Sequence, residues 1–227
     1  MLTPDEKALN QKLKKAFQAL KLELYNPRES GDDTDKRLRE IIEVEADLIS
    51  VPSKVWKKPG TKKSPSAYKE ACNNVRNDEF SFKTGFSTPF VVDKPNGSQR
   101  WPDCLVVFGT TSIPIEFKRS EDGKVLWNSG LPKPGGIYVF NGKDGLEAGT
   151  TFFMGQALLP CEVSRSLRVA AEANKDVAKR FNEILESDNW SLYARPMFNC
   201  LDRPLSSGSR SQREEDALLH LENFKWL

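Results

Sequence analysis

The sequence is poor in the residues on which several classes of enzyme depend. Its 227 residues include one histidine, His220, so we do not expect a zinc hydrolase, a nuclease that binds metal through several histidines, or a two-histidine acid/base site. The four cysteines are widely spaced and form no Cys-x-x-Cys pair, which argues against a zinc module and predicts reduced, mostly buried thiols. There is also no GxxxxGK loop and no helicase motif.

Long apolar runs and a strong charge bias are missing as well. No apolar run reaches the length of a membrane span, and the first residues are charged, so we expect a cytoplasmic protein. The net charge is only +2, from 34 basic and 32 acidic residues. This does not exclude DNA binding, because the local distribution of charge neutralises phosphates. Lysines are concentrated within residues 54–63 and arginines within 203–213, and for either group alone a solvated surface is the simpler interpretation.

The length and a hydrophobic fraction of 38% indicate one globular domain spanning residues 1–227. We expect a mainly helical N-terminal part over residues 1–80, a sheet over residues 86–160 that carries the chemistry, and a helical C-terminal part over residues 161–227.

Residues 100–119 carry the strongest functional signal. Residues 104–108 and 112–118 are rich in β-branched and aromatic side chains, and a turn centred on Gly109-Thr110 would pair them as antiparallel strands. That register places Asp103 opposite Glu116, with Cβ atoms roughly 5 Å apart. Side chains alternate along a strand, so Lys118 joins both carboxylates on one face. Pro114 removes a hydrogen-bond donor, so we expect a bulge or an edge there.

Two neighbouring carboxylates repel each other when both are ionised, so they need a cation, a proton or a basic neighbour. Mg²⁺ prefers oxygen ligands and keeps several waters, so we expect it to bind Asp103, Glu116 and the carbonyl of Phe117. Mn²⁺ is expected to substitute. Lys118 would orient or deprotonate the attacking water. The structural alternative is a surface hairpin with an incidental Glu-Lys pair.

Pro102-Asp103, twelve intervening residues and then Glu116-Phe117-Lys118 resemble the PD-(D/E)XK motif of the restriction-endonuclease-like nucleases. The resemblance implies metal binding by Asp103 and Glu116 and catalysis by Lys118. Residues 124–140 and 151–155 resemble the downstream portion of some type II restriction endonucleases. These likenesses imply a prokaryotic enzyme that cuts duplex DNA, works as a homodimer and has a cognate DNA methyltransferase in the same system.

Residues 34–49 are expected to form a helix capped by Thr34 or Asp35, and its apolar stripe contains one carboxylate, Glu45. In the nucleases named above, a helix ahead of the core strands often adds an acidic residue to the metal site. Glu45 is therefore a candidate catalytic residue. The alternative is a structural pair with a buried arginine or lysine.

The fold class expected from these patterns is α/β, with a restriction-endonuclease-like core of about five mixed strands flanked by helices. Residues 51–60 are expected to be extended, and residues 80–89 irregular. The strands are predicted over residues 90–93 pairing with 99–101 around an Asn-Gly turn, then over 112–118, 136–140 and 150–154, with an edge strand near 190–198. The other helices are predicted over residues 4–25, 66–78, 163–186 and 213–224. The long helix over 163–186 is expected to cover the sheet, with a dimer interface as the alternative.

The function that these residues support best is a type II restriction endonuclease that hydrolyses phosphodiester bonds with Mg²⁺. The alternatives are a structure-selective or repair nuclease of the same fold and a non-catalytic DNA-binding module. The candidate DNA-contacting side chains are Arg119, Lys124, Asn128 and Arg195.

Overall fold

The computed structural model describes residues 2–57, 66–98, 100–127, 130–159, 161–185, 187, 189–194, 197–200 and 203–226. The helices are α1 (Pro4–Leu20), α2 (Gly31–Glu45), α3 (Ser53–Lys57), α4 (Ser66–Arg76), α5 (Gly155–Leu158), α6 (Cys161–Leu185) and α7 (Arg210–Glu222). The strands are β1 (Ile49–Val51), β2 (Ser81–Asp93), β3 (Cys104–Ser120), β4 (Val125–Trp127), β5 (Ile137–Asp144), β6 (Glu147–Met154) and β7 (Phe198–Cys200).

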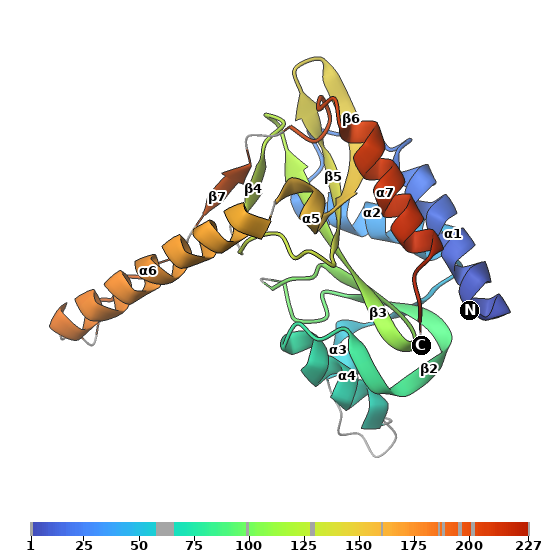
Figure 1. Ribbon diagram of the computed structural model, residues 1–227, viewed down its shortest axis with the longest axis horizontal. Coiled ribbons are helices and arrows are strands. Elements are labelled where there is room, and N and C mark those ends of the chain that lie inside the picture. The colour runs from blue at the N-terminus through green and yellow to red at the C-terminus, as the bar shows by residue number, and fades with distance from the viewer. Residues whose placement is uncertain are drawn as a thin grey trace.

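A five-stranded mixed sheet with the order β1-β2-β3-β5-β6 forms the centre of the molecule (Figure 1). β1 is parallel to β2, β2 is antiparallel to β3, β3 is parallel to β5, and β5 is antiparallel to β6. The expected α/β class with a five-stranded mixed sheet flanked by helices is therefore confirmed. β4 and β7 form a separate two-stranded sheet.

Strand β3 doubles back on itself. The amide nitrogen of Phe117 lies 2.9 Å from a carboxylate oxygen of Asp103, although fourteen residues of a straight strand would span about 46 Å. The chain reverses near Gly109, which has φ +56° and where a Cβ would collide with the carbonyl oxygen of Trp226. We call residues 104–108 the first limb of β3 and residues 112–120 the second.

Each limb pairs with a different neighbour. The first limb pairs with β2, with Val106 opposite Val91, and the second limb pairs with β5 from Ile115 onward. Pro114 lies between these two paired stretches, so its missing donor interrupts neither of them. The predicted pairing of residues 90–93 with 99–101 is wrong. Residues 90–93 belong to β2 and pair with residues 104–107 instead, while Arg100 and Trp101 are not in a strand and residue 99 lies outside the described residues.

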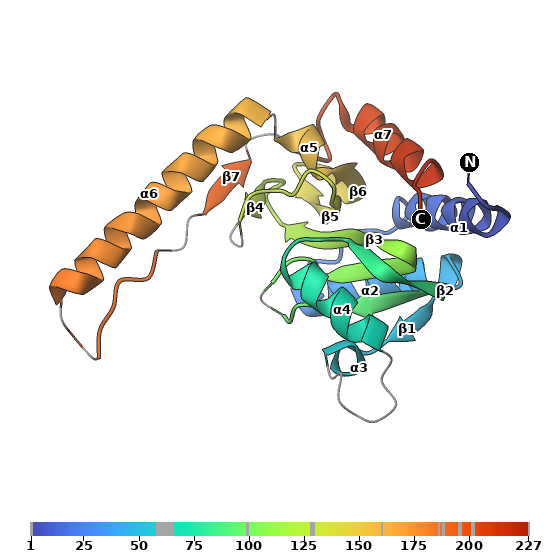
Figure 2. The ribbon, with the colours of Figure 1, turned by 60° about the horizontal axis from the view of Figure 1, so that its bottom comes forward.

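Helices cover both faces of the sheet. Helices α1, α2 and α7 pack on one face, where Leu13, Leu38 and Leu221 join Ile113, Ile115 and Phe117 of the second limb in the largest core. Helices α3 and α4 cover the other face of β1 and β2 (Figures 1 and 2), around a second core that includes Trp56 and Val107. A third, smaller apolar cluster lies on that same face beyond the second limb and contains Trp127, Tyr138 and Phe140.

Three local predictions in the N-terminal part are corrected. Helix α2 is capped by Ser30, whose side chain accepts a hydrogen bond from the Asp33 amide, so the helix starts earlier than expected from Thr34 or Asp35. Residues 53–57 form the short helix α3, because Pro52 lies before its first turn, where no amide donor is needed. Residues 81–89 are strand rather than irregular chain, and register shifts between Ser81 and Phe90 accommodate Gly85 and Pro89.

Helix α6 does not cover the sheet, which corrects the expectation for residues 163–186. It projects from the body of the protein, with β4 and β7 beside its N-terminal end (Figures 1 and 2). Of the α6 residues whose side chains the structure describes, only Ala178 is buried. The predicted edge strand near 190–198 is reduced to β7, which pairs with β4. In the part of the chain that the structure describes, no helix has both the length and the apolarity that a membrane crossing requires.

Candidate active site

The reversal of β3 brings Asp103, the residue directly before its first limb, to Glu116 and Lys118 on its second limb. Asp103 Oδ2 accepts the hydrogen bond from the Phe117 amide at 2.9 Å, which places its carboxylate beside the second limb. Lys118 Nζ lies 2.7 Å from Glu116 Oε1 and 5.5 Å from the centre of the Trp127 ring. The expected juxtaposition of these three side chains is therefore present in the structure.

Burial controls the electrostatics of the two carboxylates. The Glu116 side chain is 8% exposed, and its second oxygen, Oε2, is buried without a hydrogen-bond partner. Burial raises the pKa of Glu116, although the charge of Lys118 opposes that rise. Burial likewise raises the pKa of Asp103, against the Phe117 hydrogen bond and the charge of Lys118. Two desolvated carboxylates with raised pKa values form a site that favours a cation or a proton.

The polar cluster lies between two apolar patches on one face of the sheet. Asp103 is in phase with Leu105 and Val107 of the second core, because alternate residues of a strand share a face. Glu116 and Lys118 are paired in register with Tyr138 and Phe140 of the third cluster. Three charged groups on an otherwise apolar face are costly unless they serve a purpose or are fully paired.

The third acidic side chain near this site is Asp35, not Glu45. Glu45 is the last residue of α2 and is exposed, so the prediction that it points into the protein is wrong. Burial raises the pKa of Asp35 to about 7, and the negative charges of Asp103 and Glu116 add to the shift. Asp35 therefore lies within electrostatic reach of both carboxylates. It was missed because it was interpreted as a helix cap, although it precedes the buried Leu38 by three residues and Ile42 by seven.

Lys94 supplies a second positive charge at this end of the sheet. Its amide donates a 2.7 Å hydrogen bond to the carbonyl of Asp103, and its Nζ lies 2.7 Å from Asp32 on α2. Its charge opposes the raised pKa values of Asp35 and Asp103. Lys94 thus links the N-terminal turn of α2 to the start of β3.

The proposed DNA-contacting residues are placed differently from one another. The Arg119 guanidinium lies 4.9 Å from the Tyr25 ring and donates to the carbonyls of Asn26 and Pro27, so the body of the protein holds it. Lys124 is half-buried in the segment before β4, and its amide donates to Asp122. Asn128 and Arg195 lie outside the described residues.

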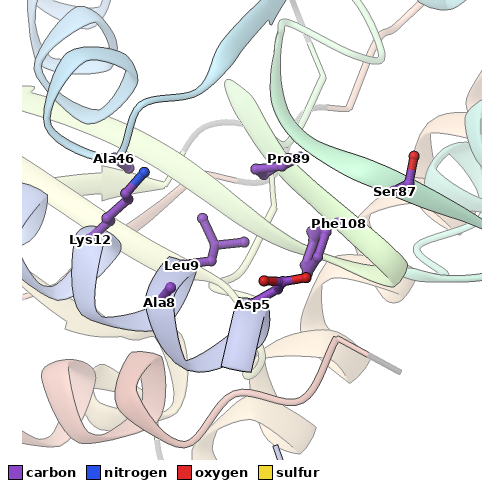
Figure 3. Close-up of a pocket in the computed structure, with 8 residues that line it drawn as sticks. All are labelled: Asp5, Ala8, Leu9, Lys12, Ala46, Ser87, Pro89 and Phe108. Atoms are coloured by element: carbon purple, nitrogen blue, oxygen red, sulfur yellow. The ribbon is translucent and has the colours of Figure 1, made fainter. Parts of the chain in front are cut away.

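A shallow pocket of about 200 Å³ lies elsewhere, between α1 and the turn region of β2 and β3 (Figure 3). Leu9, Ala46 and Phe108 line it, with Asp5 and Lys12 at its sides. The pocket contains none of the residues of the site formed by Asp103, Glu116 and Lys118, which we call the β3 site. The Nζ atom of Lys12 already lies 3.0 Å from a carboxylate oxygen of Asp47. The charged cluster and the pocket therefore lie in different parts of the protein.

The donor set of the β3 site fits a hard cation that keeps part of its water shell. Among the described residues, no three His, Cys, Asp or Glu side chains are close enough to hold a metal ion by themselves. Asp103, Glu116 and the main-chain carbonyl of Phe117 are three oxygen donors, a set suited to Mg²⁺ with waters completing the shell. The partnerless Oε2 of Glu116 is the observation that favours such a cation.

Comparisons of this chain with protein-family models, with curated proteins and with solved structures gave no match. The functional interpretation therefore depends on the residues and geometry of this chain.

Proposed function

We propose that the protein is a Mg²⁺-dependent endonuclease of the type II restriction class, which hydrolyses phosphodiester bonds at a specific site in duplex DNA. The observation that carries this proposal is the cluster of Asp103, directly before the first limb of β3, with Glu116 and Lys118 on the second limb, and a buried, partnerless oxygen on Glu116. Its sequence spacing resembles the PD-(D/E)XK motif. The restriction-endonuclease-like core is part of the proposal.

Each side chain has a distinct role in this mechanism. Asp103 and Glu116, with the carbonyl of Phe117, would hold Mg²⁺. When bound, Mg²⁺ lowers the pKa of a coordinated water and polarises the phosphoryl oxygen. Lys118 holds the attacking water through a hydrogen bond and stabilises the negative charge that develops on the phosphate. Its ion pair with Glu116 keeps the ammonium group beside the carboxylates before substrate binds.

Trp127 lies against the ammonium group of Lys118. The centre of the ring lies 5.5 Å from the ammonium nitrogen, and the ring packs edge-to-face against Tyr138 in the third apolar cluster. A cation over an aromatic ring is stabilised by the negative face of the ring. Strand β4, which carries Trp127, therefore acts as one wall of the proposed site.

Asp35 is a positioning residue in this proposal. Its carboxyl lies within electrostatic reach of the two metal-binding carboxylates, so its protonation state changes the negative charge around them. Lys94 balances part of that charge. A cognate DNA methyltransferase is the partner expected for an enzyme of this class.

Cleavage of plasmid and phage DNA tests the proposal directly. The purified protein is incubated with each DNA, and with a branched and a flapped duplex, in Mg²⁺, in Mn²⁺ and in EDTA, and the variants Asp103→Asn and Glu121→Gln are assayed in parallel, the second as a control at an exposed residue. Discrete fragments that require the metal and Asp103, but not Glu121, are the expected result. Intact DNA in every lane would overturn the restriction-enzyme proposal. Binding without cleavage would favour the DNA-binding module, and cleavage only of branched or flapped duplexes would favour the structure-selective nuclease.

A further inference from the structure

Helix α6 carries an apolar stripe that its own chain leaves open. Val163, Val177 and Ile184 are 47%, 63% and 80% exposed, and the side chain of Phe181 is 47% exposed. Such values are unusual for large apolar side chains within one helix of a folded protein, and contiguous exposed apolar surface marks an interaction site.

The stripe repeats every seven residues. The d positions of this repeat are Val163, Ala170, Val177 and Ile184. The a positions are Leu167, Asn174 and Phe181, each of which precedes a d position by three residues. Alternating spacings of three and four residues are the a and d pattern of a coiled coil, in which two helices pack with side chains of one in the holes of the other. A seven-residue period fits a left-handed supercoil, so it selects another helix as its partner rather than a flat sheet.

Asn174 occupies the central a position of the stripe and is exposed. A single polar residue at an a position reduces the stability of a coiled coil but specifies its register and favours a two-stranded assembly. Asn174 in the middle of the stripe, which we also call the seam, is therefore compatible with a pair of helices. The same residue would be unfavourable if the stripe were buried in the apolar core of a larger partner.

The chain itself covers a different side of the helix. Asn182 exchanges two hydrogen bonds with the main chain of Leu192, at 2.9 Å and 2.6 Å, so the segment after α6 returns alongside its C-terminal half. Ala178, one position after Val177, is the residue that is buried. The returning segment therefore lies next to the stripe, and the exposed side chains of Trp190, Leu192 and Tyr193 extend the apolar surface.

Charge favours a protein partner over nucleic acid at this surface. Residues 161–185 contain five lysines and arginines and four aspartates and glutamates, so the helix is nearly neutral. A nearly neutral helix with an apolar seam neither attracts phosphates strongly nor repels a copy of itself. The stripe runs from Val163 to Ile184, which is 22 residues or about 32 Å of helix, so it offers a second helix about six turns of contact.

We propose that α6 pairs along this stripe with α6 of a second copy of the chain, forming a two-stranded helical interface on a two-fold axis. A second copy of the chain supplies a partner helix with the same seven-residue period. Pairing about a two-fold axis uses the same surface patch on both chains. Helix α6 projects from the body of the protein (Figures 1 and 2), and the large apolar side chains at both ends of the stripe, Val163 and Ile184, are 47% and 80% exposed. This interface is independent of the nuclease proposal, since it needs neither metal nor DNA.

Sedimentation analysis of the full chain without DNA and in EDTA tests the interface. The variant Val177→Lys places a charge in the seam, and Val169→Lys is its matched control, because Val169 is equally exposed, at 66%, but lies off the stripe. We expect the wild-type chain and Val169→Lys to sediment as dimers, and Val177→Lys to show a dissociation constant at least about a hundredfold higher. Circular dichroism establishes that both variants keep their helix content. The variant Asn174→Ile is expected to associate about tenfold more tightly than the wild type.

Three outcomes would overturn the interface: a wild-type chain that remains monomeric at its highest soluble concentration, a dimer that Val177→Lys leaves intact, or equal disruption by Val169→Lys. None of these depends on cleavage activity. A monomeric protein that cuts DNA would contradict the proposed interface and support the proposed function. A dimeric protein that does not cut DNA would support the interface and contradict the function.

Discussion

The amide of Phe117 donates a 2.9 Å hydrogen bond to the carboxylate of Asp103, fourteen residues earlier in the chain. This bond joins the two limbs of β3 at the candidate site. Because the bond comes from the strand that carries Glu116 and Lys118, that strand also orients the carboxylate of Asp103. The geometry of the three side chains is therefore determined within one β-hairpin.

Replacement of Asp103 separates its structural role from its proposed catalytic role. The variant Asp103→Asn keeps an oxygen that can accept the Phe117 hydrogen bond, whereas Asp103→Ala leaves that amide without its acceptor, at a cost of about 1 kcal/mol. We expect both variants to lose cleavage and only the alanine variant to lose stability. Urea unfolding beside the DNA cleavage assay measures both effects. Equal stability of the two variants would show that the hydrogen bond contributes little.

Replacement of Glu116 by glutamine should stabilise the fold while it abolishes cleavage. The net effect of the surroundings, Lys118 included, raises the pKa of Glu116, because burial disfavours its charged form. A neutral isostere should therefore increase the free energy of unfolding by about 1 kcal/mol at pH 8 without metal. The midpoint of thermal unfolding checks this, with Glu121→Gln as the exposed control. A lower midpoint would mean that the ion pair with Lys118 dominates instead.

Replacement of Lys118 by methionine tests its role in the chemical step. Methionine has a similar length and can still pack on Trp127, but it has no charge and no donor. We expect single-turnover cleavage to slow by a factor on the order of 10² to 10⁴, with DNA binding in EDTA reduced much less. Equal losses of binding and cleavage would assign Lys118 to substrate affinity rather than to the reaction.

The two acidic residues of α2 make a matched comparison. Asp35 is partly buried and within electrostatic reach of the site, whereas Glu45 is exposed at the end of the same helix. We expect Asp35→Asn to change the cleavage rate and the Mg²⁺ concentration needed for half-maximal activity, and Glu45→Gln to leave both unchanged. Titration of activity with Mg²⁺ distinguishes them, and an effect of Glu45 alone would reverse the assignment made from the structure.

Glu214 predicts an acid sensitivity that is separate from the site. Burial tends to raise its pKa, but hydrogen bonds from Lys21, Thr151 and Arg210 outweigh that effect and hold the pKa below its ordinary value. A folded-state pKa below the unfolded value means that the stabilisation is complete above the unfolded pKa of about 4.5 and is lost as the pH falls.

The variant Glu214→Gln should therefore cost about 1 to 3 kcal/mol at pH 7 and flatten the loss of stability between pH 5 and pH 3. Urea unfolding at several pH values measures the slope. Glu147→Gln is the control, because Glu147 is exposed and 4.0 Å from Arg210. The same slope in Glu214→Gln and in the wild type would contradict the assignment.

The local pattern of residues 100–119 was sufficient to predict the central geometry. Asp103 and Glu116 are brought together by alternation along two strands and by a turn at Gly109, where φ is positive, and these properties are encoded within twenty residues. The long strand β2 was not predicted over residues 81–89, because Gly85 and Pro89 are typical of irregular chain and only long-range pairing with β3 compensates for them.

The errors over Asp35, Glu45 and α6 have a different origin. Helical periodicity gives the direction of a side chain only relative to its own helix. Because the start of α2 was predicted four residues too late, Asp35 was interpreted as a helix cap, and Glu45 was predicted to be the inward-facing carboxylate. The apolar positions of α6 likewise predicted an apolar face but not what it meets. Both questions depend on how elements pack, which sequence spacing does not contain.

The hairpin form of β3 also determines when the candidate site can assemble during folding. Asp103 and Glu116 are thirteen residues apart, so closing the loop between them costs little chain entropy, whereas Asp35 precedes Asp103 by 68 residues. The carboxylate pair belongs to a structure of low contact order, which forms quickly, and the acid of α2 joins only when that helix docks. Two of the three acidic groups are thus set by a local folding event and the third by a global one, so partial unfolding that releases α2 would change the charge of the site before it disrupts the pair.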